Sequence, residues 1–225
     1  MNLERSMRDQ AELTLRDGVE LLGELHPLLE QLGSLDGLVT LTAASSSLAR
    51  PAVESYETLA VFLRAYLDQM LVPLEWPAIR RAFDHASHNE TRELIALDQE
   101  IARHPAFIDF ASASRRVGKS QLQRLRPLRD ARVVQRYLSA VEEGRAQAWH
   151  TLVYGLTLAV YSLPIRQGLV LYARQTLSGF IHAAARPLQV SERGCRELLD
   201  ELCAGLPSCL EALISGANRS GPPSS

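Results

Sequence analysis

The chain has 225 residues, of which 46% are hydrophobic, so it can build one sizeable core in one domain or two small ones. A formal net charge of −2 disfavours a dedicated nucleic-acid-binding protein. Three cysteines, Cys195, Cys203 and Cys209, match no zinc-binding spacing and indicate a reducing compartment. Because the mixed-charge residues 1–17 do not resemble a signal peptide, we expect a cytoplasmic protein.

Apolar residues recur along the chain with the 3.6-residue period of helices that bury one face. The first stripe consists of Leu15, Val19, Leu22 and Leu29, and later stripes lie within residues 56–70, 134–141, 170–184 and 195–206. Prolines interrupt these runs, so we expect eight to ten short helices. Ser55 and Ser191 are predicted to cap two of them.

The remaining segments complete an all-α prediction. Residues 33–50 are rich in Gly, Ser and Thr and are predicted to form a loop or a short irregular segment. No alternating strand pattern is present in the sequence. We therefore expect a single compact all-α domain over residues 1–214, followed by a disordered tail over residues 215–225.

Residues 113–120 read ASRRVGKS and fit the loosest form of a P-loop around Lys119, the only lysine in the chain. A working P-loop needs a buried strand before it and a glycine-rich turn whose N–H groups surround the phosphates. Here Arg115 and Arg116 occupy the turn, and no apolar strand precedes it. The sequence therefore predicts a helix surface, and a nucleotide-binding enzyme remains as an alternative.

Residues 146–165 form a stretch of 20 residues without a formal charge, which is long enough to span a bilayer. Polar side chains within it and Pro164 near its end favour a buried central helix of a helical bundle over a small membrane protein. Small residues in this region and the next helix suit close helix packing, in the core or at a dimer face: Gly155, Gly179 and Ala183.

Residues 115–136 carry eight basic side chains and one acidic side chain, Asp130. A solvated helix face and a docking surface for an acidic protein both fit this pattern. A nucleic-acid surface fits less well, because aromatic residues for base stacking are not interleaved with the charges.

His85 and His88 are spaced to share a metal ion, but the sequence supplies no evident third ligand. No serine or cysteine lies in an activating motif for nucleophilic catalysis. The residues therefore predict no metal site and no cofactor, and a protein that is not an enzyme.

Several motifs, taken in order, resemble the UreF family of urease accessory proteins. RRVGKSQLQRL resembles the family's Arg-x-x-Gly-Arg-Ser segment, with Gly118, Lys119 and Ser120 on matching positions. His150 to Gly155 resembles the start of a family helix, Leu163-Pro164 matches the start of the next one, and Arg186 falls on a basic position. LAVFLRAYLDQMLVPLEWPAIRRAF looks like the family's segment with the Pro-Leu-Asp/Glu-x-Pro pattern. In the family's N-terminal motif, Gly37-Leu38 matches the Gly-Leu pair, but the Pro-Val-Gly-Gly element is absent and Val39 stands where the motif has Glu.

The resemblance implies an all-α, non-catalytic homodimer that bridges a UreD/UreH-type protein and the UreG GTPase while nickel is delivered to apo-urease. A UreF-like paralogue that serves as a general helical interaction module is the alternative. The expected partner-binding positions are Arg115, Arg116, Gly118, Lys119, Ser120, His150, Tyr154 and Arg186. For His150, a helix cap or a buried hydrogen bond is favoured over nickel ligation.

Overall fold

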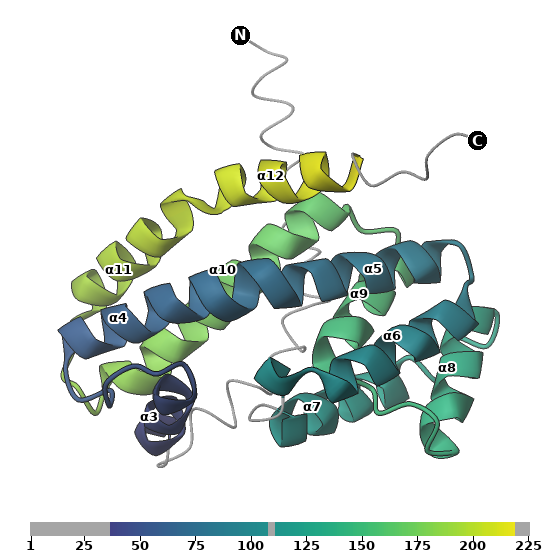
Figure 1. Cartoon of the computed structure of the whole chain (residues 1–225), viewed down its shortest axis with the longest axis horizontal. Coiled ribbons are helices and arrows are strands. Elements are labelled where there is room, and N and C mark those ends of the chain that lie inside the picture. Colours follow the sequence, from purple (N-terminus) through teal and green to yellow (C-terminus); the bar gives the residue numbers. More distant parts are fainter. Residues whose placement is uncertain (1–36, 108–110, 219–225) are drawn as a thin grey trace, which may run out of the picture.

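The computed structural model describes residues 37–107 and 111–218, and this part of the chain forms helices and connecting turns without a β-strand (Figure 1). The prediction of an all-α fold is confirmed. The first predicted stripe, which starts at Leu15, lies outside the described residues.

Helix α3 (Gly37–Ser47) forms where a loop was predicted, so that prediction is wrong for these residues. Leu41 and Ser45 are fully buried, and the Ser45 hydroxyl donates to the carbonyl of Pro51 at 2.6 Å. The hydroxyls of Ser46 and Ser47 donate to carbonyls four residues earlier within the helix. Burial against the rest of the protein therefore outweighs a composition that is poor for helices.

A long rod consists of α4 (Tyr56–Tyr66), the π-helix η1 (Leu67–Glu75) and α5 (Trp76–Ser87), which follow one another without a break (Figure 1). Ser55 caps α4 as predicted, since its hydroxyl accepts from the N–H of Thr58 at 3.3 Å.

Pro73 lies inside η1, so the expectation that this proline separates two helices is wrong. In an α-helix the proline ring collides with the carbonyl four residues earlier and one N–H is missing. The π-helix bonds over five residues instead, and its wider turn accommodates the ring.

Buried side chains form two clusters along the rod. The first cluster lies mainly between α3, α4, η1, α10 (Ile165–Ala185), α11 (Glu192–Ala204) and α12 (Leu206–Asn218). The second cluster lies mainly between α5, α6 (Thr91–Arg103), α7 (Ala111–Arg124), α8 (Arg132–Glu142) and α9 (His150–Val160). A short 3₁₀ turn, η2 (Pro105–Phe107), follows α6 and adds Phe107 to the second cluster.

Helix α9 is buried at every position from His150 to Leu158, which confirms the predicted central helix. It packs against α5, and Gly155 allows the two backbones to approach closely: a Cβ there would lie 2.4 Å from the carbonyl oxygen of Ile79. Gly155 therefore serves packing within one chain. Within the described ranges, no helix is both long enough and apolar enough to cross a membrane.

The C-terminal helices start where the sequence indicates. Helix α10 follows Pro164, and the hydroxyl of Ser191 caps α11 by accepting from the N–H of Gly194 at 3.1 Å. Helix α12 extends to Asn218, four residues beyond the expected domain boundary at 214. Residues 219–225 of the expected tail lie outside the described part of the chain.

Candidate functional site

Helix α7 carries most of the predicted site, and Gly118, Lys119 and Ser120 lie well inside it. Val117, Gly118 and Gln121 are buried, whereas Arg116, Lys119 and Ser120 are exposed. A P-loop needs free backbone N–H groups in a turn, but the N–H groups of a helix interior bond to its own carbonyls. This segment therefore does not have the geometry of a phosphate-binding loop.

Gly118 is the point where α7 meets the segment that leads into α9. A Cβ at Gly118 would lie 1.9 Å from the carbonyl oxygen of Ala148 and 2.9 Å from the backbone nitrogen of His150. No side chain fits at such distances, so glycine is required by the close contact of the two backbones.

Residues 146–149 precede α9 without regular structure, and Ala148 has a positive φ of 58°, a conformation that costs free energy for alanine. The fully buried carboxylate of Asp98, from α6, stabilises this segment. It accepts from the N–H of Gln147 at 2.7 Å, the N–H of Ala148 at 3.0 Å and the hydroxyl of Tyr137 at 2.6 Å.

The environment of Asp98 acts on its pKa in two directions. Burial raises the pKa of this carboxyl above its ordinary value, and the hydrogen bonds from Tyr137 and from the backbone of residues 147–149 partly oppose that shift. In addition, the Ser114 hydroxyl of α7 accepts from the N–H of His150 at 3.1 Å. Asp98 thus satisfies N–H groups of the segment before α9, and Ser114 satisfies the N–H of His150, the first residue of α9, whose N-cap Trp149 makes no side-chain capping hydrogen bond.

Arg115 points back toward the same segment. Its guanidinium donates to the side-chain oxygen of Gln147 at 2.7 Å and to the carbonyl of Ala111 at 3.1 Å, and it lies 5.7 Å from the ring centre of Trp149. These contacts occupy the arginine within the chain, so its geometry supports a structural role.

His150 and Tyr154 lie inside the protein on α9. The Nδ1 atom of His150 lies 3.1 Å from the side-chain oxygen of Gln121, so the expected buried hydrogen bond is present. The Tyr154 hydroxyl donates to the carbonyl of Gly168 at 2.9 Å, and burial raises the pKa of this phenol. Both rings pack against Tyr172 of α10, with ring centres 5.7 Å and 5.1 Å away.

A second buried acid lies at the end of η1. Glu75 is 8% exposed, and its Oε1 atom accepts from the Tyr66 hydroxyl at 2.6 Å. Burial raises the pKa of the Glu75 carboxyl to about 7, although the hydroxyls of Tyr66 and Tyr172 act in the opposite direction. Its other carboxyl oxygen is buried without a hydrogen-bond partner.

The motifs noted in the sequence agree with a comparison to known families. The UreF family model matches residues 53–203, which extend from just before α4 almost to the end of α11. The chain belongs to the UreF family. UreF proteins are urease accessory proteins, so the predicted family is confirmed. No curated protein matches the chain.

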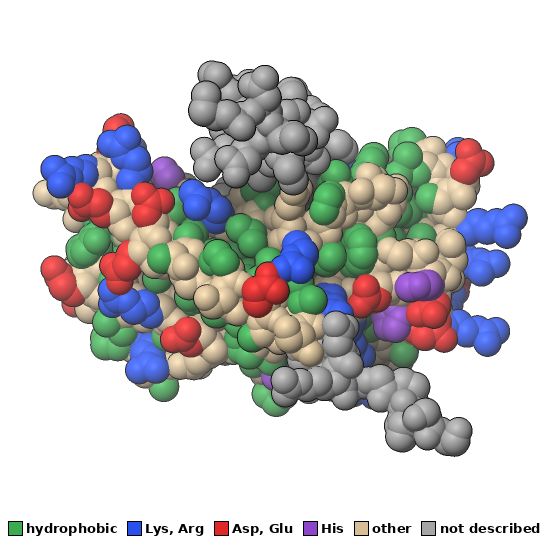
Figure 2. Space-filling view, turned by 90° about the horizontal axis from the view of Figure 1, so that it is seen from above, with side chains coloured by type: hydrophobic (Ala, Val, Ile, Leu, Met, Phe, Trp, Pro, Cys, Tyr) green, Lys and Arg blue, Asp and Glu red, His purple; other side chains and the backbone are tan. Residues whose placement is uncertain are grey.

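In this UreF-family chain, four of the exposed side chains of α7 form a stripe, which we call the outer stripe: Arg116, Lys119, Ser120 and Gln123. The neighbouring helix α8 begins close by, and α8 and the turn before it add exposed arginines to this part of the surface: Arg129, Arg132 and Arg136. Arg126 forms an ion pair with Glu142, which reduces its charge at the surface. Elsewhere, on the side seen in Figure 2, acidic and basic side chains are interspersed.

Arg186 is exposed at the end of α10. Since α10 packs mainly in the first cluster and α7 in the second, the two expected basic positions lie on different parts of the UreF fold.

The two histidines considered as a metal pair have separate partners. His85 Nδ1 lies 2.8 Å from a carboxyl oxygen of Glu90, and His88 Nδ1 lies 2.8 Å from the backbone oxygen of Asp84. The described residues contain no group of three or more His, Cys, Asp or Glu side chains arranged to hold a metal ion.

The sequence analysis missed the acids and amide that organise this site: Glu75, Asp98 and Gln121. One signal was available for Asp98, because it falls among the apolar positions of α6, between Leu94 and Ile101. A charged residue at such a position indicates a buried interaction. Glu75 lay in the UreF-like Pro-Leu-Glu segment, but no local pattern connects it with Tyr66.

Proposed function

We propose that this chain is a non-catalytic adaptor in urease maturation, which bridges a UreD/UreH-type accessory protein and the UreG GTPase while nickel is inserted into apo-urease. Membership of the UreF family is the observation that carries the proposal. The work would take place in the cytoplasm, on a homodimer of the chain.

The outer stripe of α7 is the proposed docking surface for one of these proteins. Arg116 and Lys119 extend to solvent from a helix whose other side is fixed against α9 by Gly118. A rigid helix that presents positive charge suits an acidic protein surface, because opposite potentials speed the encounter and fix the orientation of the two proteins.

The residues around the stripe would act indirectly. Gly118, His150 and Tyr154 are buried, so in this arrangement they support α7 and α9 and do not meet a partner. The absence of a loop at residues 113–120 supports a role without nucleotide hydrolysis, since the Gly-Lys-Ser sequence lies within a helix.

Co-purification tests the proposal. The tagged chain is co-expressed with the UreD/UreH-type protein, UreG and apo-urease, and we expect a stable complex and active urease. Lys119→Glu and Arg116→Glu should each reduce the recovered partner several-fold while the unfolding curve stays unchanged. Arg50→Glu, which reverses an exposed charge outside the outer stripe, serves as the matched control.

Two outcomes would contradict the proposal. One is a chain that remains alone in the presence of all these proteins. The other is equal loss of partner in the Lys119 and Arg50 variants, which would remove the outer stripe as the docking surface. Turnover of GTP or ATP by the purified chain alone would show that the protein is not a passive adaptor.

A further inference from the structure

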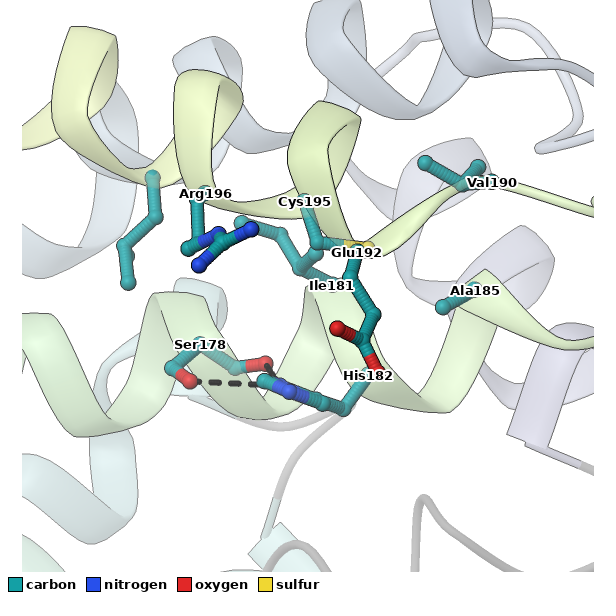
Figure 3. Close-up of a pocket in the computed structure, with 9 residues that line it drawn as sticks. Ser178, Ile181, His182, Ala185, Val190, Glu192, Cys195 and Arg196 are labelled. Atoms are coloured by element: carbon teal, nitrogen blue, oxygen red, sulfur yellow. Dashed lines mark hydrogen bonds between the residues drawn. The ribbon is translucent and has the colours of Figure 1, made fainter.

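An open groove of about 320 Å³ lies between α10 and α11, and Figure 3 shows the side chains that line it. Its floor is apolar and comes from both helices and the turn between them: Ile181, Ala185, Val190, Cys195 and Leu199. Polar side chains surround this floor, namely Ser178, His182, Glu192 and Arg196.

Part of the floor reaches the surface, since Ala185, Val190 and Leu199 are half-buried, whereas Ile181 and Cys195 are buried beneath them. His182 is held back along α10, because its Nδ1 atom lies 2.7 Å from the carbonyl oxygen of Ser178 in its own helix. Figure 3 shows Ile181 and Cys195 converging from the two helices. An apolar groove between two helices with a polar rim is suited to the apolar face of a third helix.

The chain itself leads toward this groove. Helix α3 contacts α10, and its residue Leu41 belongs to the same buried cluster as Ile181, which also lines the groove. The 36 residues that precede α3 therefore join the described structure beside the helix that forms one wall of the groove.

Those residues contain a sequence with the properties that the groove requires. Residues 9–26 carry the apolar stripe Leu15, Val19 and Leu22, with the i, i+4, i+7 spacing of a helix that inserts one face into a groove. Pro27 ends this run before α3 begins.

Charge favours the same pairing. Residues 9–26 contain five acidic residues and one arginine, whereas residues 37–225 contain 21 basic and 18 acidic residues. The rim of the groove carries one arginine, Arg196, and one acid, Glu192, and a further arginine, Arg174, is exposed one turn before Ser178 on the same side of α10.

From these observations we infer that residues 9–26 bind the groove between α10 and α11 of the same chain, with the stripe Leu15, Val19 and Leu22 on its floor. The inference concerns contacts within the chain and does not depend on the proposed docking of accessory proteins.

Chain length allows this contact and favours it over contact with a second copy. The 15-residue span from Leu22 to Gly37 can reach about 50 Å, whereas α10, with 21 residues, is about 32 Å long. A tether of this length keeps the segment at an effective concentration on the order of millimolar, well above that of a second copy in dilute solution.

Cys195 provides a direct test in the full-length chain, because its side chain lines the groove. Alkylation of each cysteine is followed by mass spectrometry, with Cys209 on α12 as the internal reference. Val19→Glu places a charge on the apolar stripe, and Gln10→Glu places one on the opposite face of the same predicted helix. We expect Cys195 to react several-fold faster in Val19→Glu than in the wild type, and at the wild-type rate in Gln10→Glu.

A disulfide test is independent of whether those variants alter the fold. Under mild oxidation, Leu22→Cys should form an intramolecular disulfide with Cys195, whereas Asp17→Cys, on the far face, should not. Equal Cys195 reactivity in all variants would overturn the inference. So would an absent Leu22→Cys disulfide, or one that only links two chains, since the latter would assign the groove to a second copy.

Discussion

The Tyr66 hydroxyl lies 2.6 Å from the Oε1 atom of Glu75, and this hydrogen bond joins α4 to the end of the π-helix inside the core. Such a bond does not compensate fully for burying the carboxylate, because the other oxygen of Glu75 has no hydrogen-bond partner. The protonated form of Glu75 is therefore favoured in the folded protein.

The free energy of unfolding should consequently fall as the pH rises from the pKa of Glu75 in the unfolded chain to its higher pKa in the folded protein. The pKa of Glu75 is raised from 4.5 to about 7 in the folded protein. At a pH between these two pKa values, the folded state holds a proton that the unfolded state has released, so the free energy of unfolding decreases by about 3 kcal/mol across this range. Above the higher pKa, both states have lost the proton and the contribution of Glu75 no longer changes with pH. In Glu75→Gln this decrease should be absent.

Urea unfolding of both proteins at pH 5 and pH 7.5 measures the difference. Glu54→Gln, at an exposed position, should retain the pH dependence of the wild type. If the free energy of unfolding changed equally between the two pH values in the wild type and in Glu75→Gln, Glu75 would be ionised at neutral pH in the folded protein.

Gly118→Ala should destabilise the protein by about 3 kcal/mol, because the new methyl group meets the carbonyl oxygen of Ala148, which belongs to the backbone and cannot rotate away. The better helix propensity of alanine returns only about 1 kcal/mol. Gly205→Ala is the matched control, since a Cβ there meets no atom within 4 Å. We expect its unfolding curve to equal or slightly exceed that of the wild type, and a neutral Gly118→Ala would disprove the close contact.

Asp98→Ala should cost about 3–5 kcal/mol, because it leaves the Tyr137 hydroxyl and the N–H groups of Gln147 and Ala148 buried without an acceptor. Asp98→Asn should cost less, since its amide oxygen can still accept one of these bonds. Hydrogen exchange provides a local measure: the amides of residues 147–150 should lose protection in Asp98→Ala before those of α11. Unchanged exchange at these amides would contradict the role of Asp98, and Asp130→Ala, at an exposed acid, controls for the loss of charge.

Arg115 and Arg116 are adjacent in sequence but should differ in function. Arg115→Ala should lower the free energy of unfolding by about 1–2 kcal/mol, through loss of its hydrogen bonds to Gln147 and Ala111 and its contact with Trp149. Arg116→Ala should leave stability unchanged and reduce co-purification of the accessory proteins. Paired unfolding and pull-down measurements check both variants. If Arg116→Ala lowered the stability and Arg115→Ala reduced co-purification, the outer stripe would not be the docking side of α7.

Helical periodicity predicted most of the fold because each helix buries one face, and local spacing records which face that is. It failed for α3, which is stabilised by the burial of Leu41 in the first cluster and by the buried hydrogen bond from Ser45 to Pro51. It also failed at Pro73, because the composition of residues 67–75 does not distinguish a helix break from a π-helical turn.

The candidate site was predictable in part. The motif around Gly118 and Lys119 pointed to α7, and periodicity within α7 separates the buried glycine from the exposed lysine. The role of Asp98 could not be derived from local spacing, because its backbone partners lie about 50 residues away in sequence. Contacts of this kind are decided by how the helices pack.

The rod of α4, η1 and α5 passes through both buried clusters, and this arrangement has a consequence for cooperativity. Neither cluster can lose its share of the rod without exposing apolar side chains of the other. The described part of the chain should therefore melt in a single transition, with the helices of both clusters lost at the same temperature.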